Sequence, residues 1–161
     1  MRVAVLFSGG KDSNFALYEA KKFHEVCCLI TMKSSNPHSY MFQSAGVEFT
    51  RFQSEALQIP LLVHETCGEK EAEVEDLKDA ILEAKESYRI EGVVSGAINS
   101  AYQASRVQRV CSEVGLWCFN PLWQRDEVEF LHELVDTGFK VMIVGVASYP
   151  LDAGFLGEVL D

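Results

Sequence analysis

Short apolar runs alternate with stretches of helical periodicity along the chain, and this alternation limits the fold more than any other feature of the sequence. The apolar runs predict strands at Val3–Phe7, Val26–Met32, Leu61–Val63, Gly92–Gly96, Trp117–Phe119 and Phe139–Val146. Strands that alternate with helices build right-handed βαβ units and a mainly parallel sheet covered on both faces. We therefore predict an α/β fold, with a parallel sheet as the middle layer of a three-layer sandwich.

Apolar positions at helical spacing predict which side of each intervening helix is buried. The first helix should bury Ala16, Ala20 and Phe23. The next two helices should bury two larger sets: Leu77, Ala80, Ile81, Ala84 and Tyr88, and then Val107, Val110, Cys111 and Val114. Asp126 is expected to cap one further helix.

Length and composition narrow the class of protein. A chain of 161 residues suits one core, so a single domain over residues 1–161 is expected. No apolar run approaches the roughly 20 residues of a membrane span, and the first residues lack a signal-peptide pattern. A formal net charge of −10 makes nucleic acid an unlikely partner. Five cysteines, two of them adjacent, indicate no disulfide framework, and a cytoplasmic location is expected.

Two glycines follow the first predicted strand, in a segment that we call the glycine loop: Ser8, Gly9, Gly10, Lys11, Asp12 and Ser13. Glycine lets the backbone approach an anion closely, and the N–H groups at a helix start attract negative charge. Lys11 adds a positive charge, and Asp12 could orient the loop or hold Mg²⁺. The pattern favours a site for the phosphates of ATP over the alternative, a plain strand-to-helix turn.

Ligands of parallel sheets bind beyond the carboxyl ends of the strands. The loops after Phe7, Met32, Ser95 and Phe119 should therefore meet at one rim. The glycine loop has neither the Walker spacing GxxxxGK[ST] nor the dinucleotide spacing GxGxxG. It resembles the SGGxDS loop of the PP-loop ATP pyrophosphatases, which typically split ATP between its α and β phosphates. This resemblance implies a Rossmann-like sandwich of the HUP (adenine nucleotide alpha hydrolase-like) type.

Further motifs resemble the diphthine–ammonia ligase family over nearly all of the chain. They are Ser39–Phe42, Val94–Ile98, Tyr102-Gln103, Arg106-Val107, Val110-Cys111, Pro121–Trp123 and Arg125-Asp126. In that family, ATP activates the carboxylate of diphthine, a modified histidine of translation elongation factor 2, and ammonia then forms the amide. The resemblance implies a ligase that uses ATP, Mg²⁺ and ammonia, acts on elongation factor 2 and releases AMP and pyrophosphate from an acyl-adenylate.

The resemblance also implies roles for individual residues. Lys11, Asp12 and Arg106 are the expected catalytic residues, and Asp12 is the expected metal ligand. The glycine loop, together with Thr31, Met32, Gly96 and Ala97, should border the nucleotide. The expected substrate contacts are Tyr40, Tyr102, Gln103, Trp123 and Arg125. Each of three residues also has a structural alternative. Arg106 could lie on a solvated helix face, Trp123 could pack in the core, and Tyr40 could anchor a loop.

The end of the chain differs from the family pattern. Glu158 stands where the family tends to have arginine, and the chain stops at Asp161. The family's further C-terminal region, which helps to form the acceptor site, is therefore expected to be absent. A homo-oligomer or a partner could then complete the cleft.

Two other functions remain open at this level. A PP-loop enzyme that thiolates tRNA would need an exposed reactive cysteine, for which Cys67 is the candidate. A non-catalytic ATP-binding module would bind ATP without releasing AMP or pyrophosphate.

Overall fold

The computed structural model describes all residues except 37–38, 40, 43–45 and 147–148. The chain forms two compact units, Met1–Trp123 and Gln124–Asp161, and each is described by itself. A single ATP-binding domain over the whole chain stays a prediction. None of the described helices is long and apolar enough to cross a membrane.

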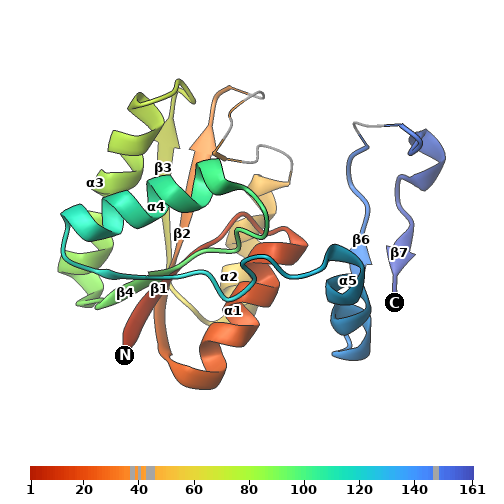
Figure 1. Cartoon of the computed structure of the whole chain (residues 1–161), viewed down its shortest axis with the longest axis horizontal. Coiled ribbons are helices and arrows are strands. Elements are labelled where there is room, and N and C mark those ends of the chain that lie inside the picture. The colour runs from red at the N-terminus through yellow and green to blue at the C-terminus, as the bar shows by residue number, and fades with distance from the viewer. Residues whose placement is uncertain (37–38, 40, 43–45, 147–148) are drawn as a thin grey trace. The chain divides into compact units, whose positions relative to one another are not determined.

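A five-stranded parallel sheet forms the middle of the first unit (Figure 1). Its strands are β1 (Arg2–Leu6), β2 (Glu25–Ser34), β3 (Leu61–Thr66), β4 (Gly92–Val94) and β5 (Trp117–Phe119). The strand order is β3-β2-β1-β4-β5, and all four pairs are parallel. The α/β prediction is confirmed. Because the chain leaves β1 and β4 in opposite directions, a crevice is expected between their carboxyl ends.

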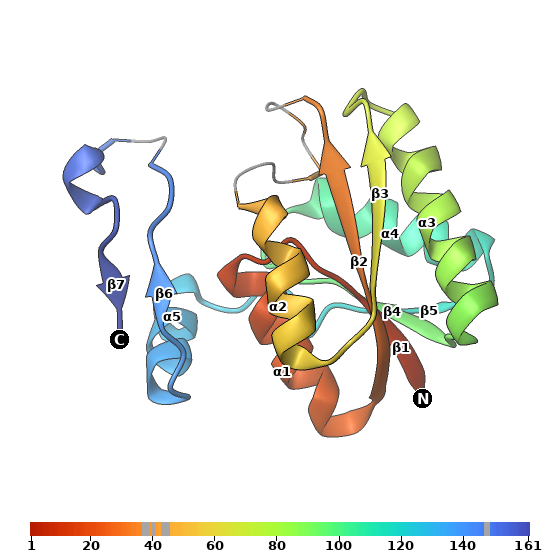
Figure 2. The same cartoon turned by 180° about the vertical axis from the view of Figure 1, so that it is seen from behind.

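Helices cover both faces of this sheet (Figures 1 and 2). The helices α1 (Lys11–Phe23) and α2 (Thr50–Leu57) lie on one face, and α3 (Ala72–Tyr88) and α4 (Ala101–Glu113) lie on the other. A short 3₁₀ helix, η1 (Val47–Phe49), leads into α2. Two covered faces explain why the central strands are continuous apolar runs, since both sides of each strand are buried.

The core of this unit lies between α3, α4 and the sheet. The predicted inner face of α3 is confirmed, because Leu77, Ala80, Ile81 and Ala84 are all fully buried. The inner face of α4 is also confirmed, with Val107, Val110, Cys111 and Val114 in the same cluster.

The prediction for the end of α1 was wrong in one residue. Ala16 and Ala20 are buried, but Phe23 is 76% exposed. Phe23 is the last residue of α1, and the backbone turns at His24 into the extended conformation that leads to β2. The helical periodicity of apolar residues in the sequence extends to Phe23. In the structure, however, most of the Phe23 side chain is left uncovered.

Helix α2 was not predicted from the sequence. Thr50 and Ser54 are the buried residues of this helix, whereas Phe52 is 64% exposed. A helix whose buried side is small and polar shows no apolar periodicity, so the pattern that identifies the other helices is missing.

The second unit contains α5 (Glu127–Asp136), a short 3₁₀ helix η2 (Ala153–Phe155) and two short strands. Asp126 caps α5 as predicted, because its Oδ1 accepts from the N–H groups of Val128 and Glu129 at 3.0 Å each. The predicted long strand Phe139–Val146 was wrong. Only β6 (Val141–Met142) forms, and it pairs antiparallel with β7 (Val159–Leu160). An apolar run does not specify its partner, and here the partner is a later segment of the same unit.

Candidate functional site

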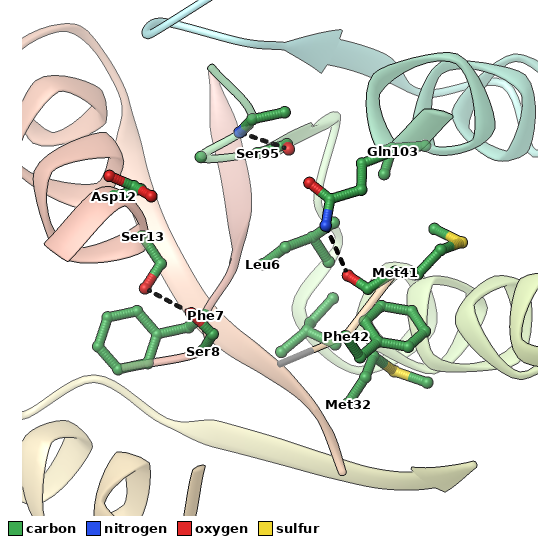
Figure 3. A pocket seen from close by; sticks show the side chains of 14 residues that line it. Leu6, Phe7, Ser8, Asp12, Ser13, Met32, Met41, Phe42, Ser95 and Gln103 are labelled. Atoms are coloured by element: carbon green, nitrogen blue, oxygen red, sulfur yellow. Dashed lines mark hydrogen bonds between the residues drawn. The ribbon is translucent and has the colours of Figure 1, made fainter. Parts of the chain in front are cut away.

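A cavity of about 170 Å³ lies at the carboxyl ends of the central strands (Figure 3). Its walls come from the ends of β1 and β2, the start of α1, the segment after β2, the turn after β4, and α4. The lining residues are Leu6, Phe7, Ser8, Asp12, Ser13, Ile30, Met32, Met41, Phe42, Ser95, Gly96, Ala97, Gln103 and Val107. One side is polar, formed by the glycine loop and Ser95, and the other is apolar, formed by methionine and phenylalanine side chains.

The glycine loop connects β1 to α1 on the polar side. Gly9 has φ of +79°, a left-handed conformation that glycine adopts without strain. Gly10 is the N-cap of α1 and provides no side-chain cap, so the first N–H groups of the helix have no acceptor within α1. Ser8 Oγ donates to Ser13 Oγ at 3.3 Å, and Figure 3 shows these two side chains next to each other. Such a helix start is suited to binding an anion.

Two side chains of opposite charge stand at the start of α1. Lys11 Nζ pairs with Asp12 Oδ1 at 2.7 Å, and both side chains are about one-third exposed, at 35% and 39%. Asp12 lines the cavity, whereas Lys11 is not among the lining residues. The pair keeps a cation and a carboxylate together at the edge of the pocket.

The turn after β4 packs directly against the first turn of α1. A Cβ atom added to Gly96 would lie 3.0 Å from the carbonyl carbon of Asp12 and 3.0 Å from the nitrogen of Ser13. Next to it, the N–H of Ala97 donates to Ser95 Oγ at 3.2 Å. Gly96 therefore lets the two loops approach each other, in addition to any contact that it makes with a ligand.

The two predicted residues of β2 have different environments. Met32 lines the apolar side of the cavity. Thr31 is buried, and its Oγ1 donates to the carbonyl oxygen of Phe7 at 2.6 Å. Thr31 thus holds the end of β1, from which the glycine loop starts.

Helix α4 contributes Gln103 to the cavity. Its Nε2 donates to the carbonyl oxygen of Met41 at 3.0 Å, which ties the backbone at Met41 to α4 (Figure 3). Tyr102 and Arg106 lie outside the lining set. The Arg106 guanidinium stacks 3.5 Å from the centre of the Tyr102 ring and lies 3.5 Å from Glu71 Oε1. Its Nε is buried and has no hydrogen-bond partner among the described residues.

The comparison with known protein families agrees with this geometry. Residues 1–118 match a family model described as "Diphthamide synthase N-terminal domain". The chain belongs to this diphthamide synthase family. Its likeness to individual relatives extends further along the chain than the family model does.

Relatives of this diphthamide synthase family member are named diphthine--ammonia ligase. The human protein is 33% identical over the whole chain, which spans 68% of the human length. The mouse protein is 34% identical over 99% of the chain and 67% of the mouse length. The Schizosaccharomyces pombe protein is 32% identical over 99% of the chain, which covers 29% of that longer protein.

A solved structure shares the fold of the family member. It is described as a predicted subunit of tRNA methyltransferase from Methanocaldococcus jannaschii, with a TM-score of 0.55. The likeness covers 92% of this chain and 81% of that one. At 21% identity, it supports the fold alone.

The remaining predicted residues lie apart from the cavity lining or outside the described part. Trp123 ends the first unit and is 37% exposed. Arg125 belongs to the second unit, where its guanidinium pairs with Glu133. Tyr40 lies outside the described residues. The roles of these residues in the diphthamide synthase family member stay predictions.

Two residues at the glycine loop were missed by sequence reasoning. Asn14 Nδ2 donates to the carbonyl oxygens of Gly9 and Gly10 at 2.9 and 3.0 Å. Gln53 Nε2, on α2, donates to the carbonyl oxygen of Gly9 at 3.1 Å. Asn14 directly follows the motif and could have been considered with it. Gln53 could not, because nothing in the sequence places α2 next to this loop.

The cysteines of the family member differ in their environments. All five are free thiols, and Cys67 is exposed. Burial raises the pKa of Cys28 to about 12, and burial likewise raises the pKa of Cys27. A hydrogen bond with Cys118, together with burial, raises the pKa of Cys111. These three thiols are therefore held in the protonated, unreactive form at neutral pH.

Proposed function

We propose that the chain is an ATP-dependent ligase that converts the carboxylate of diphthine on translation elongation factor 2 to an amide. Its membership in the diphthamide synthase family and the names of its relatives support this activity. The observation that carries the proposal is the cavity at the carboxyl end of the sheet, with the glycine loop and the start of α1 on its polar side. Free thiols agree with the proposed cytoplasmic location.

The proposed chemistry needs no nucleophile from the protein. A carboxylate oxygen of diphthine attacks the α-phosphorus of ATP, the bond to the β-phosphate oxygen breaks, and pyrophosphate leaves. Ammonia then attacks the acyl carbon, AMP leaves, and the proton lost from nitrogen passes to solvent. The main task of the enzyme is therefore to orient the reactants and to stabilise the charge that develops on phosphate oxygens.

The glycine loop is proposed to hold the leaving pyrophosphate. The first N–H groups of α1 would donate to its oxygens, and Lys11 would neutralise part of the charge. The Asp12 carboxylate lines the cavity and suits a Mg²⁺ ion, which usually takes one or two protein carboxylates and fills its shell with phosphate oxygens and water. Mg²⁺ would supply further charge neutralisation there.

The apolar side of the cavity is proposed to receive the adenosine portion of ATP. Met32, Met41, Phe42 and Ala97 offer apolar surface there, with Thr31 and Gly96 supporting the loops around them. The acceptor is proposed to approach from the side of α4, past Tyr102, Gln103 and Arg106. Tyr40, Trp123 and Arg125 are further proposed substrate contacts, in a monomer or a homo-oligomer.

The decisive experiment combines the chain with ATP, Mg²⁺, ammonium and elongation factor 2 that carries diphthine. Mass spectrometry should detect AMP, pyrophosphate and the amide on the modified histidine. Omission of ammonium should abolish the amide. Intact ATP and unconverted diphthine in the complete mixture would contradict the proposal.

The comparisons do not favour the two alternatives. A tRNA-thiolating enzyme would depend on Cys67, so loss of activity in Cys67→Ser would argue for it. A non-catalytic module would bind ATP without forming AMP in the same mixture.

A further inference from the structure

The carbonyl group of Gly9 is held by two side-chain amides. Asn14 Nδ2, in α1, donates to it at 2.9 Å, and Gln53 Nε2, in α2, donates to it at 3.1 Å. A carbonyl oxygen has two lone pairs, so these two bonds use its accepting capacity. Two helices thus fix one peptide group of the glycine loop.

Because the peptide group is planar, fixing the Gly9 carbonyl also fixes the direction of the Gly10 N–H. The N–H of Gly10 belongs to the same planar unit as the Gly9 carbonyl, and in a trans peptide the two groups point in opposite directions. The Gly10 N–H donates a long hydrogen bond to Ser8 Oγ, at 3.4 Å between nitrogen and oxygen, and Ser8 lines the cavity, so this N–H faces the cavity side. Because glycine rotates easily, a held carbonyl is needed to keep this N–H on the cavity side.

The contact between α2 and the loop is close and well supported. A Cβ atom on Gly9 would lie 2.6 Å from Gln53 Oε1 and 3.1 Å from Thr50 Cγ2. Thr50 is buried, and its hydroxyl donates to the carbonyl oxygen of Val47 at 2.7 Å. The start of α2 therefore packs against the glycine loop at Gly9, and Thr50 itself is held to the preceding turn.

The amide of Gln53 is not explained by stability alone. Its Oε1 is buried and finds no hydrogen-bond partner in the part of the chain that the structure describes. An unpaired buried acceptor costs free energy, which an apolar side chain of the same length would avoid. The Oε1 atom of this amide therefore lowers the stability of the fold, while its Nε2 atom orients the glycine loop.

We propose that Gln53 is a positioning residue for phosphate binding, which acts through the Gly9 carbonyl to aim the Gly10 N–H at the phosphates of a bound nucleotide. This role rests on the ATP site described under Proposed function. Gln53 does not line the cavity itself, so it acts through the loop. The test must therefore separate phosphate binding from binding of the rest of the nucleotide.

Gln53→Met provides that test, since methionine keeps the length of the side chain and removes the donor. Isothermal titration calorimetry on the full chain would measure binding of ATP, inorganic pyrophosphate and AMP. Loss of one oriented donor to a charged group predicts about tenfold weaker binding of ATP and pyrophosphate. Binding of AMP should change much less, and the melting temperature should stay the same or rise. Gln108→Met, at an exposed position of α4, is the matched control.

Three outcomes would contradict the proposed role of Gln53. If Gln53→Met binds ATP and pyrophosphate as tightly as the wild type, the positioning role is wrong and the ATP site stands. If ATP and AMP weaken equally and the melting temperature falls, Gln53 is only structural. If the wild type binds neither ATP nor pyrophosphate, the proposed function fails, and the positioning role fails with it.

Discussion

Gly96 illustrates, at the scale of a single residue, how close the two loops at the site are. Gly96→Ala would place a methyl group 3.0 Å from backbone atoms of Asp12 and Ser13, which cannot move aside as a side-chain tip can. We expect a loss of stability of about 1–3 kcal/mol, typical of overpacking, measured by urea denaturation. The control is Gly145→Ala, because a Cβ there meets no atom of the described residues within 4 Å. Equal stability of the two variants would contradict this account.

Lys11 is the residue for which the electrostatic expectation is simplest. Lys11→Ala removes a positive charge from the proposed pyrophosphate site and leaves the Asp12 carboxylate without the cation that pairs with it at 2.7 Å. We expect AMP formation to fall by a factor of about 100 or more, as for loss of one preorganised charge at a developing anion. Quantification of AMP by chromatography would measure it, and unchanged turnover would remove Lys11 from the mechanism.

Thiol reactivity should separate Cys67 from the buried cysteines. Burial raises the pKa of Cys27 and Cys28, so their thiolates are scarce at pH 7. Cys67 is exposed and should react rapidly with a chromogenic disulfide reagent under native conditions. Cys67→Ser should remove the rapid phase and leave ligase activity unchanged. A rapid phase that survives this substitution would contradict the assignment.

At the scale of the elements, the sequence predicted the helices and strands whose buried residues are apolar. It did not predict the helix whose buried residues are polar. The strands β1 to β5 and the inner faces of α3 and α4 follow from apolar runs and periodicity. Helix α2 does not, because its buried residues are Thr50 and Ser54. The glycine loop was predicted from its own residues. The Gln53 contact that orients this loop was not predicted, because it depends on the position of α2. The pairing of β6 also lay beyond the sequence, since pairing depends on the partner strand.

A partly buried polar link joins Ser39 to Glu73 of α3, and it can be tested. Ser39 Oγ donates to Glu73 Oε2 at 2.7 Å and accepts from the N–H groups of Met41 and Phe42 at 3.3 and 3.1 Å. Ser39→Ala removes three hydrogen bonds and leaves the fully buried Glu73 carboxylate without this donor. We expect a loss of about 2 kcal/mol or more in unfolding free energy.

Hydrogen exchange provides the second readout for Ser39→Ala. The amides of Met41 and Phe42 should exchange faster in the variant, since they lose their acceptor. Ser105→Ala is the control, because the Ser105 hydroxyl is exposed and donates within α4, to the carbonyl oxygen of Tyr102. Unchanged exchange at Met41 and Phe42 would show that the segment is held by other contacts.

At the scale of the whole molecule, the five-stranded sheet and the described residues that line the cavity belong to Met1–Trp123. A unit with its own sheet and core can fold independently. We therefore expect a fragment of residues 1–123 to bind ATP with an affinity comparable to that of the full chain in calorimetry. A folded fragment, judged by circular dichroism, that does not bind ATP would show that the second unit is needed.

The strand order has a consequence for how this protein is made. The glycine loop is complete by Ser13, but the opposing walls come from Met41 and Phe42 and from residues between Ser95 and Val107. During synthesis the first part of the site therefore leaves the ribosome long before the last. A nucleotide can bind productively only after β4 has inserted beside β1. ATP should thus stabilise the finished unit against unfolding and offer no such help to the growing polypeptide.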